Sequence, residues 1–342
     1  MDKYFYFDDI FQDYTKYSLK IPKNMYLKSG LYPIIDQGKE EIAGYSDKNI
    51  NIFDKIPVII FGDHTRIFKY VDYPFFLGAD GVKILKNTSS LFLDKYLYYS
   101  LKNFKIPNTG YNRHFKWLKD FKIKHISLAK QEKIVSLIEK IEYFILKKKE
   151  QLKYLKKLNK SLFTKYSNSK IVKSFYIKDI SSELFAGGDK PNDYSENISK
   201  EYIYPVYSNG EKKEGLLCFS KTFKVDKEAL TISARGTIGF ITIRKAYFTP
   251  VVRLITLIPN KNNNIIYLKY AIGELNLKKL GSGVAQLTIP VFSKYKLNLP
   301  PIELQNKFAK KIEKIEKLSF EIEKSIKEAE NLYNSLINKY FE

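Results

Sequence analysis

The sequence predicts an α/β protein in which two tandem α/β modules are separated by two long helices that form an antiparallel coiled coil, giving an internal pseudo-twofold repeat. Two observations lead to this prediction: a heptad pattern occurs twice, and short strand and turn patterns precede each copy. The expected divisions are a first module at residues 1–127, a first helix at 128–168, a second module at 169–301 and a second helix at 302–342.

Mostly apolar residues recur in steps of four and three in both helical stretches, which is the spacing of the a and d positions of a coiled coil. The apolar members of this seam are Ile134, Ile138, Ile141, Ile145, Leu152, Leu155 and Leu162 in the first copy, and Phe308, Ile312, Ile315, Ile322, Ile326 and Leu336 in the second. Each seam position has its counterpart 174 residues later, as Ile134 has in Phe308. Two separate amphipathic core helices are the alternative interpretation. The shared phase favours one long helical pair.

The few polar residues of the seam are offset between the copies. Lys148 of the first copy matches Ile322 of the second, and Asn159 matches Tyr333. If the helices pair with each other, each polar side chain can face an apolar one. Isolated polar residues at a or d positions then fix the register of the coil at some cost in stability.

The modules that precede the helices also match each other, although their sequences have diverged. Tyr32-Pro33-Ile34 has a counterpart in Tyr204-Pro205-Val206. Both modules follow one plan of short strands, rich in Ile, Val and aromatic residues and bounded by Gly and Pro, with one short helix. The expected elements are strands Tyr32–Asp36, Lys55–Phe61, Phe75–Leu77 and Val82–Leu85 with helix Asp94–Asn103, and strands Ala229–Ser233, Phe240–Arg244 and Leu254–Ile258 with helix Tyr267–Leu275.

The formal net charge of +22, from 59 basic against 37 acidic residues, favours a polyanionic partner, and nucleic acid is the first candidate. The excess is mostly lysine, however, and lysine alongside abundant Asn, Ile, Tyr and Phe is also typical of an AT-biased genome. The arginines are Arg66, Arg113, Arg235, Arg244 and Arg253. All of them lie outside the two predicted helices, in the modules.

Cysteine usage and hydropathy exclude several protein classes. Cys218 is the single cysteine, so we expect neither a disulfide framework nor a zinc cluster, and a reducing cytoplasm fits. The first residues carry no basic leader followed by an apolar stretch, so no signal peptide is expected. The longest apolar run, around Pro57–Phe61, is too short to span a membrane and predicts a buried strand.

Catalytic motifs are hard to find, so we do not expect an enzyme. Asn298-Leu299-Pro300-Pro301 lacks the aromatic residue and spacing of an amino-methyltransferase loop, and no glycine-rich cofactor turn precedes it. Its prolines are better explained as ending a strand and starting the second helix. Asp63 and His64 have no acidic cluster around them, so neither a metal nor a cofactor is expected in this chain.

The order and doubling of several motifs carry a resemblance that covers nearly the whole chain. The motifs are Gly62-Asp63-His64-Thr65 followed by Gly78-Ala79-Asp80-Gly81-Val82, Arg113-His114-Phe115-Lys116-Trp117-Leu118, Arg235-Gly236-Thr237-Ile238-Gly239, and Leu299-Pro300-Pro301 with Gln305. Together with the two long helices, they make the chain resemble the specificity (S) subunit of a type I restriction–modification system. The first helix departs from the family by opening with Ser127-Leu128-Ala129 instead of prolines.

The resemblance implies that each module is a target-recognition domain that reads one half of a bipartite, asymmetric site in double-stranded DNA. The chain would be a non-catalytic, cytoplasmic subunit serving DNA methylation and host defence. Its implied partners are two methyltransferase (M) subunits and, where present, two restriction (R) subunits, with no membrane. S-adenosylmethionine and ATP would bind those partner subunits, leaving this chain without a cofactor. The alternative is a coiled-coil scaffold or adaptor that never reads DNA.

Loop residues beside the predicted strands are the candidates for DNA contacts. Cations can bind phosphates or guanine, and the amides of Asn112 and Gln286 can bond the edge of adenine. The predicted DNA-binding residues are Lys39, His64, Arg66, Asn112, Arg113, His114, Lys212, Lys213, Arg235, Thr237 and Gln286. For any one of them, a solvated loop residue is the alternative. The sequence does not reveal the recognised bases or the spacer length.

Overall fold

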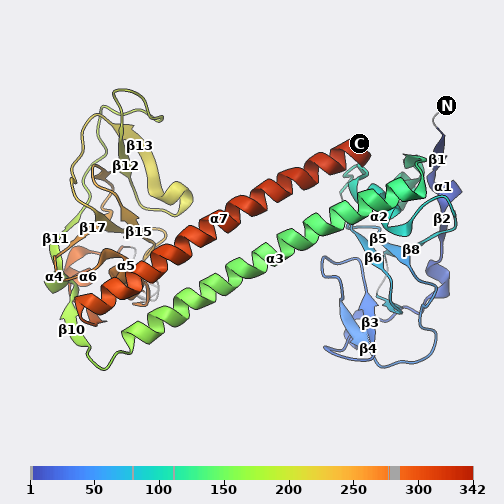
Figure 1. Ribbon diagram of the computed structural model, residues 1–342, viewed down its shortest axis with the longest axis horizontal. Coiled ribbons are helices and arrows are strands. Elements are labelled where there is room, and N and C mark those ends of the chain that lie inside the picture. Colours follow the sequence, from blue (N-terminus) through green and yellow to red (C-terminus); the bar gives the residue numbers. More distant parts are fainter. Residues whose placement is uncertain (1–2, 79–80, 111, 276, 278–285, 342) are drawn as a thin grey trace. The chain divides into compact units, whose positions relative to one another are not determined.

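A computed structural model describes residues 3–78, 81–110, 112–275, 277 and 286–341 of the chain. The chain divides into two compact units. The first unit contains residues 1–149 and 324–342, and the second contains 150–323. Each unit therefore holds one α/β module together with one part of each long helix (Figure 1). The Ala79-Asp80 part of the motif at 78–82 lies outside the described residues.

The main sheet of the first unit is antiparallel, with strand order β2-β8-β5-β6. Its strands are β2 (Phe11–Asp13), β5 (Val58–Gly62), β6 (Phe68–Val71) and β8 (Val82–Asn87). Every residue of β5 is buried, because this strand is central and both of its faces are covered. Helix α2 (Asp94–Asn103) packs on β6 and β5, and its buried side chains join those of the sheet in one core.

Two smaller sheets complete the first unit. One has the order β4-β3-β7, in which β3 (Tyr32–Ile35) pairs antiparallel with β4 (Gly44–Ser46) and parallel with β7 (Phe76–Leu77). The other is a ribbon in which β1 (Tyr4–Tyr6) pairs with β9 (Lys122–Lys124). A short helical turn, η3 (Phe115–Asp120), leads into β9 and buries Leu118. The ribbon thus joins the start of the module to the strand just before the first long helix.

The second unit repeats this topology strand for strand. Its main sheet has the order β11-β17-β14-β15, its small sheet β13-β12-β16, and its ribbon β10-β18. Helix α5 (Ile265–Gly273) packs on β15 and β14, as α2 packs on β6 and β5. The strands are β10 (Lys173–Tyr176), β11 (Ser181–Ala186), β12 (Tyr204–Tyr207), β13 (Leu216–Ser220), β14 (Ala229–Ile232), β15 (Ile241–Arg244), β16 (Thr249–Pro250), β17 (Ile255–Pro259) and β18 (Lys296–Leu299).

The two long helices are α3 (Leu128–Ser167) and α7 (Ile302–Phe341). In the first unit, the start of α3 packs with the end of α7, where Ile134 and Ile138 share a core with Ile337. In the second unit, the end of α3 packs with the start of α7, where Phe163 lies against Phe308. Within each unit the helices therefore run antiparallel.

The predicted seam residues all lie at least partly covered. Those that are buried are Ile134, Ile138, Ile141, Phe308, Ile312, Ile315, Ile322 and Ile326. Those that are half-buried are Ile145, Leu152, Leu155, Leu162 and Leu336. Toward the helix ends, buried residues also appear beside the seam, as Phe163 does beside Leu162 and Ile337 beside Leu336. The reason is that the modules cover a wider face of each helix there than a second helix alone would.

The fold class predicted from the sequence is confirmed: the chain has two sheet-rich domains with the long helix α3 between them in sequence, and their topologies are the same. Short strands such as β1 and β9 escaped the prediction, because they are three residues long and pair across more than a hundred residues of sequence. Among the described residues, none of the helices has the length and hydropathy needed to cross a membrane.

Candidate nucleic-acid interface

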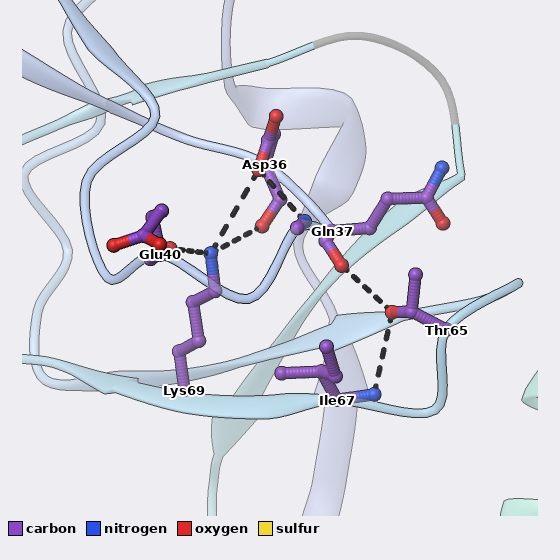
Figure 2. A network of polar contacts seen from close by, with 7 residues as sticks. Asp36, Gln37, Glu40, Thr65, Ile67 and Lys69 are labelled. Carbon is purple, nitrogen blue, oxygen red and sulfur yellow. Dashed lines mark hydrogen bonds and ion pairs between the residues drawn. The ribbon is translucent and has the colours of Figure 1, made fainter. Parts of the chain in front are cut away.

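In the first module, the loop at residues 36–43 and the turn at residues 62–67 are joined by hydrogen bonds. Thr65 Oγ1 donates to the backbone oxygen of Gln37 at 2.7 Å, and the backbone N–H of His64 donates to Gln37 Oε1 at 3.3 Å. Figure 2 shows Gln37 and Thr65 facing each other across this junction. A Cβ placed on Gly62 would lie 2.9 Å from that of Gln37, so this approach requires glycine.

The segment at residues 104–114, which follows α2, is attached to the same turn. Asp63 is buried, and its Oδ1 accepts a hydrogen bond from the backbone N–H of Phe115 at 2.7 Å. The backbone oxygen of Asp63 accepts from the backbone N–H of His114 at 2.9 Å and lies 2.9 Å from His114 Nδ1. Three segments that are distant in sequence therefore converge at one edge of the first module.

His114 does not fit the role that the sequence predicted for it. Its exposed fraction is 0%, and its ring lies against the backbone oxygen of Asp63. A fully buried ring presents no surface to DNA, so the prediction of a DNA contact at His114 is corrected. Its position explains another function: it anchors the segment that carries the exposed neighbours Asn112 and Arg113.

The remaining predicted residues of the first module reach its surface to different extents. Lys39, Asn112 and Arg113 are exposed, whereas His64 and Arg66 are half-buried. Arg66 has a positive φ of 61°, and its Nη1 donates to the backbone oxygen of Ile106 at 3.4 Å. Arg66 therefore helps to fasten the turn to the segment after α2. The three exposed residues keep surface that a ligand can reach, although Asn112 Nδ2 also donates to the backbone oxygen of Thr109.

The second module brings together the loop at 208–215, the turn at 233–240 and the turn at 251–254. Asn209 joins all three: its Oδ1 accepts from the backbone N–H of Ala234 at 2.7 Å, and its Nδ2 donates to the backbone oxygen of Val252 at 2.7 Å. Ser233 Oγ accepts from the backbone N–H of Gly210 at 3.1 Å. Asn209 thus takes the place that Gln37 has in the first module, at the start of the equivalent loop.

The structure separates the predicted residues of the second module. Lys212, Lys213 and Arg235 are exposed on the converging loops. Thr237 is half-buried, and its hydroxyl oxygen is buried without a hydrogen-bond partner among the described residues. The role of Thr237 in DNA binding therefore stays a prediction. Gln286 is half-buried and accepts from Arg253 Nη1 at 3.4 Å.

Sequence reasoning missed Gln37, Asn209 and Arg253. The first two were detectable, because each is an amide that follows a matching Tyr-Pro strand, 172 residues apart. Arg253 has a positive φ of 59° and is exposed beside Gln286, a proximity that no local pattern encodes. In both modules, then, amide side chains fasten loops to one another while basic side chains remain at the surface. That arrangement suits binding to phosphates and base edges.

Among the described residues, no group of three or more His, Cys, Asp or Glu side chains could hold a metal ion. A surface hollow of about 860 Å³ in the first unit is lined by residues of α2, α3 and α7. It does not involve the converging loops.

Comparison with known proteins identifies relatives of one kind. Residues 169–330 match the family model described as the type I restriction modification DNA specificity domain. A type I specificity subunit of Mycoplasma pneumoniae is 37% identical over 145 residues, which is 42% of this chain and 40% of the relative. The specificity subunit of a type I restriction enzyme of Escherichia coli is 23% identical over 346 residues, covering 89% of this chain and 84% of the relative.

The fold has a match among solved structures. The crystal structure of a type I restriction–modification S subunit from M. genitalium superimposes with a TM-score of 0.69 at 18% identity, covering 100% of this chain and 96% of that one. These comparisons confirm the resemblance found in the sequence motifs. The chain spans only about two fifths of the length of the M. pneumoniae relative that it matches.

Proposed function

From the premise that this chain belongs to the type I specificity-subunit family, we propose that it reads a bipartite, asymmetric DNA site, with one half-site for each module. The observation that carries the proposal is the pair of equivalent loop edges, one in each module. Both edges are built on the same topology, but they expose different basic and amide side chains. Two unlike surfaces should select two unlike half-sites.

The chemistry of the exposed groups supports two kinds of DNA contact at each loop edge, one to bases and one to phosphates. Arginine can bond guanine through two parallel hydrogen bonds in the major groove, and an amide can do the same with adenine. Arg113 and Asn112 are exposed in the first module and Arg235 in the second, so we propose these side chains for such contacts. Exposed lysines such as Lys39, Lys212 and Lys213 suit phosphates, which position the protein without reading sequence.

The proposal includes partner subunits, by analogy with the relatives. Two methyltransferase subunits and, where present, two restriction subunits would assemble on this chain, in the cytoplasm. S-adenosylmethionine and ATP would bind to those subunits, and this chain would contribute DNA recognition without catalysis. The names of the relatives, which place them in type I restriction enzymes, support this part of the proposal.

Methylome sequencing of cells that express the chain together with a type I methyltransferase subunit tests the proposal. We expect methylation at one motif made of two unlike half-sites around an unread spacer. A chain that supports no methylated motif, and shows no salt-sensitive, sequence-selective DNA binding with the methyltransferase, would instead be a scaffold.

Substitution of the exposed arginines tests which loop edge reads which half-site. Arg113→Ala should weaken specific binding by about 1–3 kcal/mol and relax one half-site if the side chain reads a base. Arg235→Ala should relax the other half-site. If either arginine binds only phosphate, affinity should fall evenly across sequences and the salt slope should flatten by about one unit.

Lys227→Ala is a matched control for these substitutions. Lys227 is also exposed and basic, but it precedes β14, at the opposite end of that strand from Arg235, and pairs with Glu183 at 2.8 Å. Its loss should change neither half-site. Unchanged binding and salt slope for Arg113→Ala would make Arg113 a solvated loop residue.

A further inference from the structure

A lysine is buried beneath the loop at 36–43 of the first module. Lys69 lies on β6 with an exposed side-chain fraction of 2%. Its Nζ donates to the backbone oxygens of Asp36 at 2.7 Å and Glu40 at 2.6 Å, and it lies 3.8 Å from Asp36 Oδ1. Figure 2 shows the ammonium enclosed by these two residues. Burial is the main cause that lowers the pKa of Lys69 below its usual range.

An apolar side chain would suit this position better if stability alone mattered. Lys69 lies opposite Ile60 in the sheet, on the face where Val58, Val71 and Ile84 form an apolar cluster. A buried ammonium is costly unless it is paired and hydrogen-bonded, and well-packed apolar residues often replace buried ion pairs without loss of stability. The lysine is therefore better explained by the loop carbonyls that it binds than by a contribution to the apolar core.

What Lys69 holds is the shape of the loop. The two carbonyls that accept from its ammonium belong to Asp36 and Glu40, on either side of the exposed Lys39. The carboxylate of Asp36 also accepts from the backbone N–H of Gly38 at 2.7 Å. Residues 36–40 are thus folded around one buried cation, and Lys39 is presented at the surface of the fold that results.

The second module has a buried cation with the same task but at another position. Arg244 lies on β15, the strand equivalent to β6, and is 4% exposed. Its Nη2 donates to the backbone oxygen of Glu214, its Nη1 pairs with Glu214 Oε2 at 3.4 Å, and its Nε donates to Thr231 Oγ1 at 3.0 Å. The guanidinium carbon lies 3.8 Å from the ring centre of Tyr207. Glu214 belongs to the loop at 208–215, next to Lys213.

The two cations occupy positions two residues apart on equivalent strands. Lys69 lies opposite Ile60, and the corresponding place in the second module is taken by Thr242, opposite Thr231. Arg244 follows two residues later, opposite Ala229. Side chains two apart on a strand point to the same face, so both cations reach the same side of their sheets. Both modules therefore use a buried cation to hold the loop, but the cation is a different residue at a different position of the strand.

We propose that Lys69 and Arg244 are positioning residues for DNA recognition, each fixing the loop at its own module's edge and thereby the base preference of its own half-site. This inference rests on the proposed function. A loop held in its bound shape loses less conformational freedom on binding, and it presents its side chains in one geometry. Without the buried cation, the loop carbonyls lose their donor and the loop can adopt several shapes. Gln37 and Asn209 bond these loops to the turns beside the proposed base-reading residues, through Asp63 and His114 to Arg113 and through Ala234 to Arg235. Those arginines are then held less firmly, so more than one base is tolerated.

The test compares Lys69→Met and Arg244→Met with Lys83→Met, each co-expressed with the methyltransferase and examined by methylome sequencing and thermal unfolding. Methionine has similar length but no N–H donors. Lys83 is a matched control, because it lies on β8 of the same sheet and bonds the side chain of Asp13 at 2.7 Å rather than a loop carbonyl.

We expect Lys69→Met to lower discrimination between bases about tenfold at one or more positions of one half-site, the size of a lost base contact. Arg244→Met should do the same in the other half-site, and Lys83→Met in neither. A general loss of stability would weaken methylation of both halves alike. Relaxation of the same half-site by both variants, or unchanged discrimination in folded variants, would overturn the inference.

Should Lys69→Met fail to fold, Lys69→Arg replaces it. The longer, planar guanidinium cannot place its donors where the ammonium does, so the loop must shift. Altered preference confined to the same half-site as Arg113→Ala supports the inference, and unaltered preference contradicts it. A wild-type chain that yields no bipartite motif would refute the proposed function, whereas a wild-type motif left unchanged in the variants refutes only the role of the buried cations.

Discussion

The two modules have the same strand order in all three of their sheets, yet they differ in the chemistry of the loops that those sheets support. Gln37 and Asn209 occupy equivalent places and make equivalent bonds to the neighbouring turn. Lys69 and Arg244 do not occupy equivalent places, although they hold equivalent loops, at 36–43 and at 208–215. The difference teaches that topology survives divergence as long as apolar positions persist, while the loops at one edge of each module can be rebuilt on the same scaffold.

The junction between module and helix is the best preserved part of the comparison. Gln131 of α3 and Gln305 of α7 are both buried, at 0% and 2% exposed. Gln131 Oε1 accepts from the backbone N–H of Leu93, the residue that caps α2, and Gln305 Oε1 accepts from that of Asn264, which caps α5. Each glutamine thus fixes a short helix to a long one. The caps differ, because Asn264 also accepts from the first turn of its own helix and Leu93 cannot.

The largest expected loss of unfolding free energy is at Phe308, which we compare with its counterpart Ile134. Phe308 is fully buried among the rings of Phe163, Tyr166, Tyr267 and Tyr270. Phe308→Ala should cost about 3–5 kcal/mol of unfolding free energy. Ile134→Ala should cost less within a range of about 2–5 kcal/mol, since fewer buried atoms are removed.

Native-state hydrogen exchange measures these costs locally. Protection should fall in the second unit for Phe308→Ala and in the first unit for Ile134→Ala. Equal loss of protection in both units for either variant would show that the two units unfold together and that the substitution destabilises the whole chain.

An intermediate effect is expected at the glutamine junctions. Gln131→Met removes bonds to three backbone groups, those of Leu93, Leu91 and Ile126. Gln305→Met removes bonds to two backbone groups and to the side chain of Asn263. Buried groups left without partners cost about 1–3 kcal/mol, so both variants should be destabilised, Gln131→Met at least as much. Chemical denaturation and then hydrogen exchange measure how much unfolding free energy each variant loses. A larger loss for Gln305→Met than for Gln131→Met would contradict this order.

The smallest effect concerns Tyr96 and Tyr267, which occupy equivalent positions of α2 and α5. The hydroxyl of Tyr267 is buried without a hydrogen-bond partner in the described part of the chain. Tyr267→Phe should therefore stabilise the protein by about 1 kcal/mol, and Tyr96→Phe by less. Thermal unfolding of both variants measures the difference. A destabilised Tyr267→Phe would mean that the hydroxyl does have a partner.

The same tyrosines predict how stability changes in alkali. Burial raises the pKa of Tyr96 and of Tyr267 to about 12, from 10.0. Between pH 10 and 12 the folded chain then holds protons that the unfolded chain has lost, so the unfolding free energy falls as pH rises through this window. Either Phe variant should flatten that decline. An unchanged slope would contradict the raised pKa.

The sequence by itself determined the duplicated plan, the long helices and their shared phase. Heptad periodicity is a local signal that repeats over many turns, so it needs no knowledge of the tertiary fold. The strands Tyr32–Ile35 and Val82–Asn87 and the helix Asp94–Asn103 were predicted close to their observed positions, because residue type and bounding turn residues are also local signals. Exposed candidates such as Arg113 and Arg235 followed from loop position and residue type.

Only the tertiary structure decided which polar residues face inward. His114 was predicted to bind DNA but is buried against Asp63, and Lys69 reads in sequence as one more surface lysine although it is enclosed. Their partners lie 51 and 33 residues away in the chain. Burial depends on which distant segments converge, and no periodicity encodes that convergence. The converging loops of the first module are held by such long-range contacts, which is why the residues that hold them were found only in the folded chain.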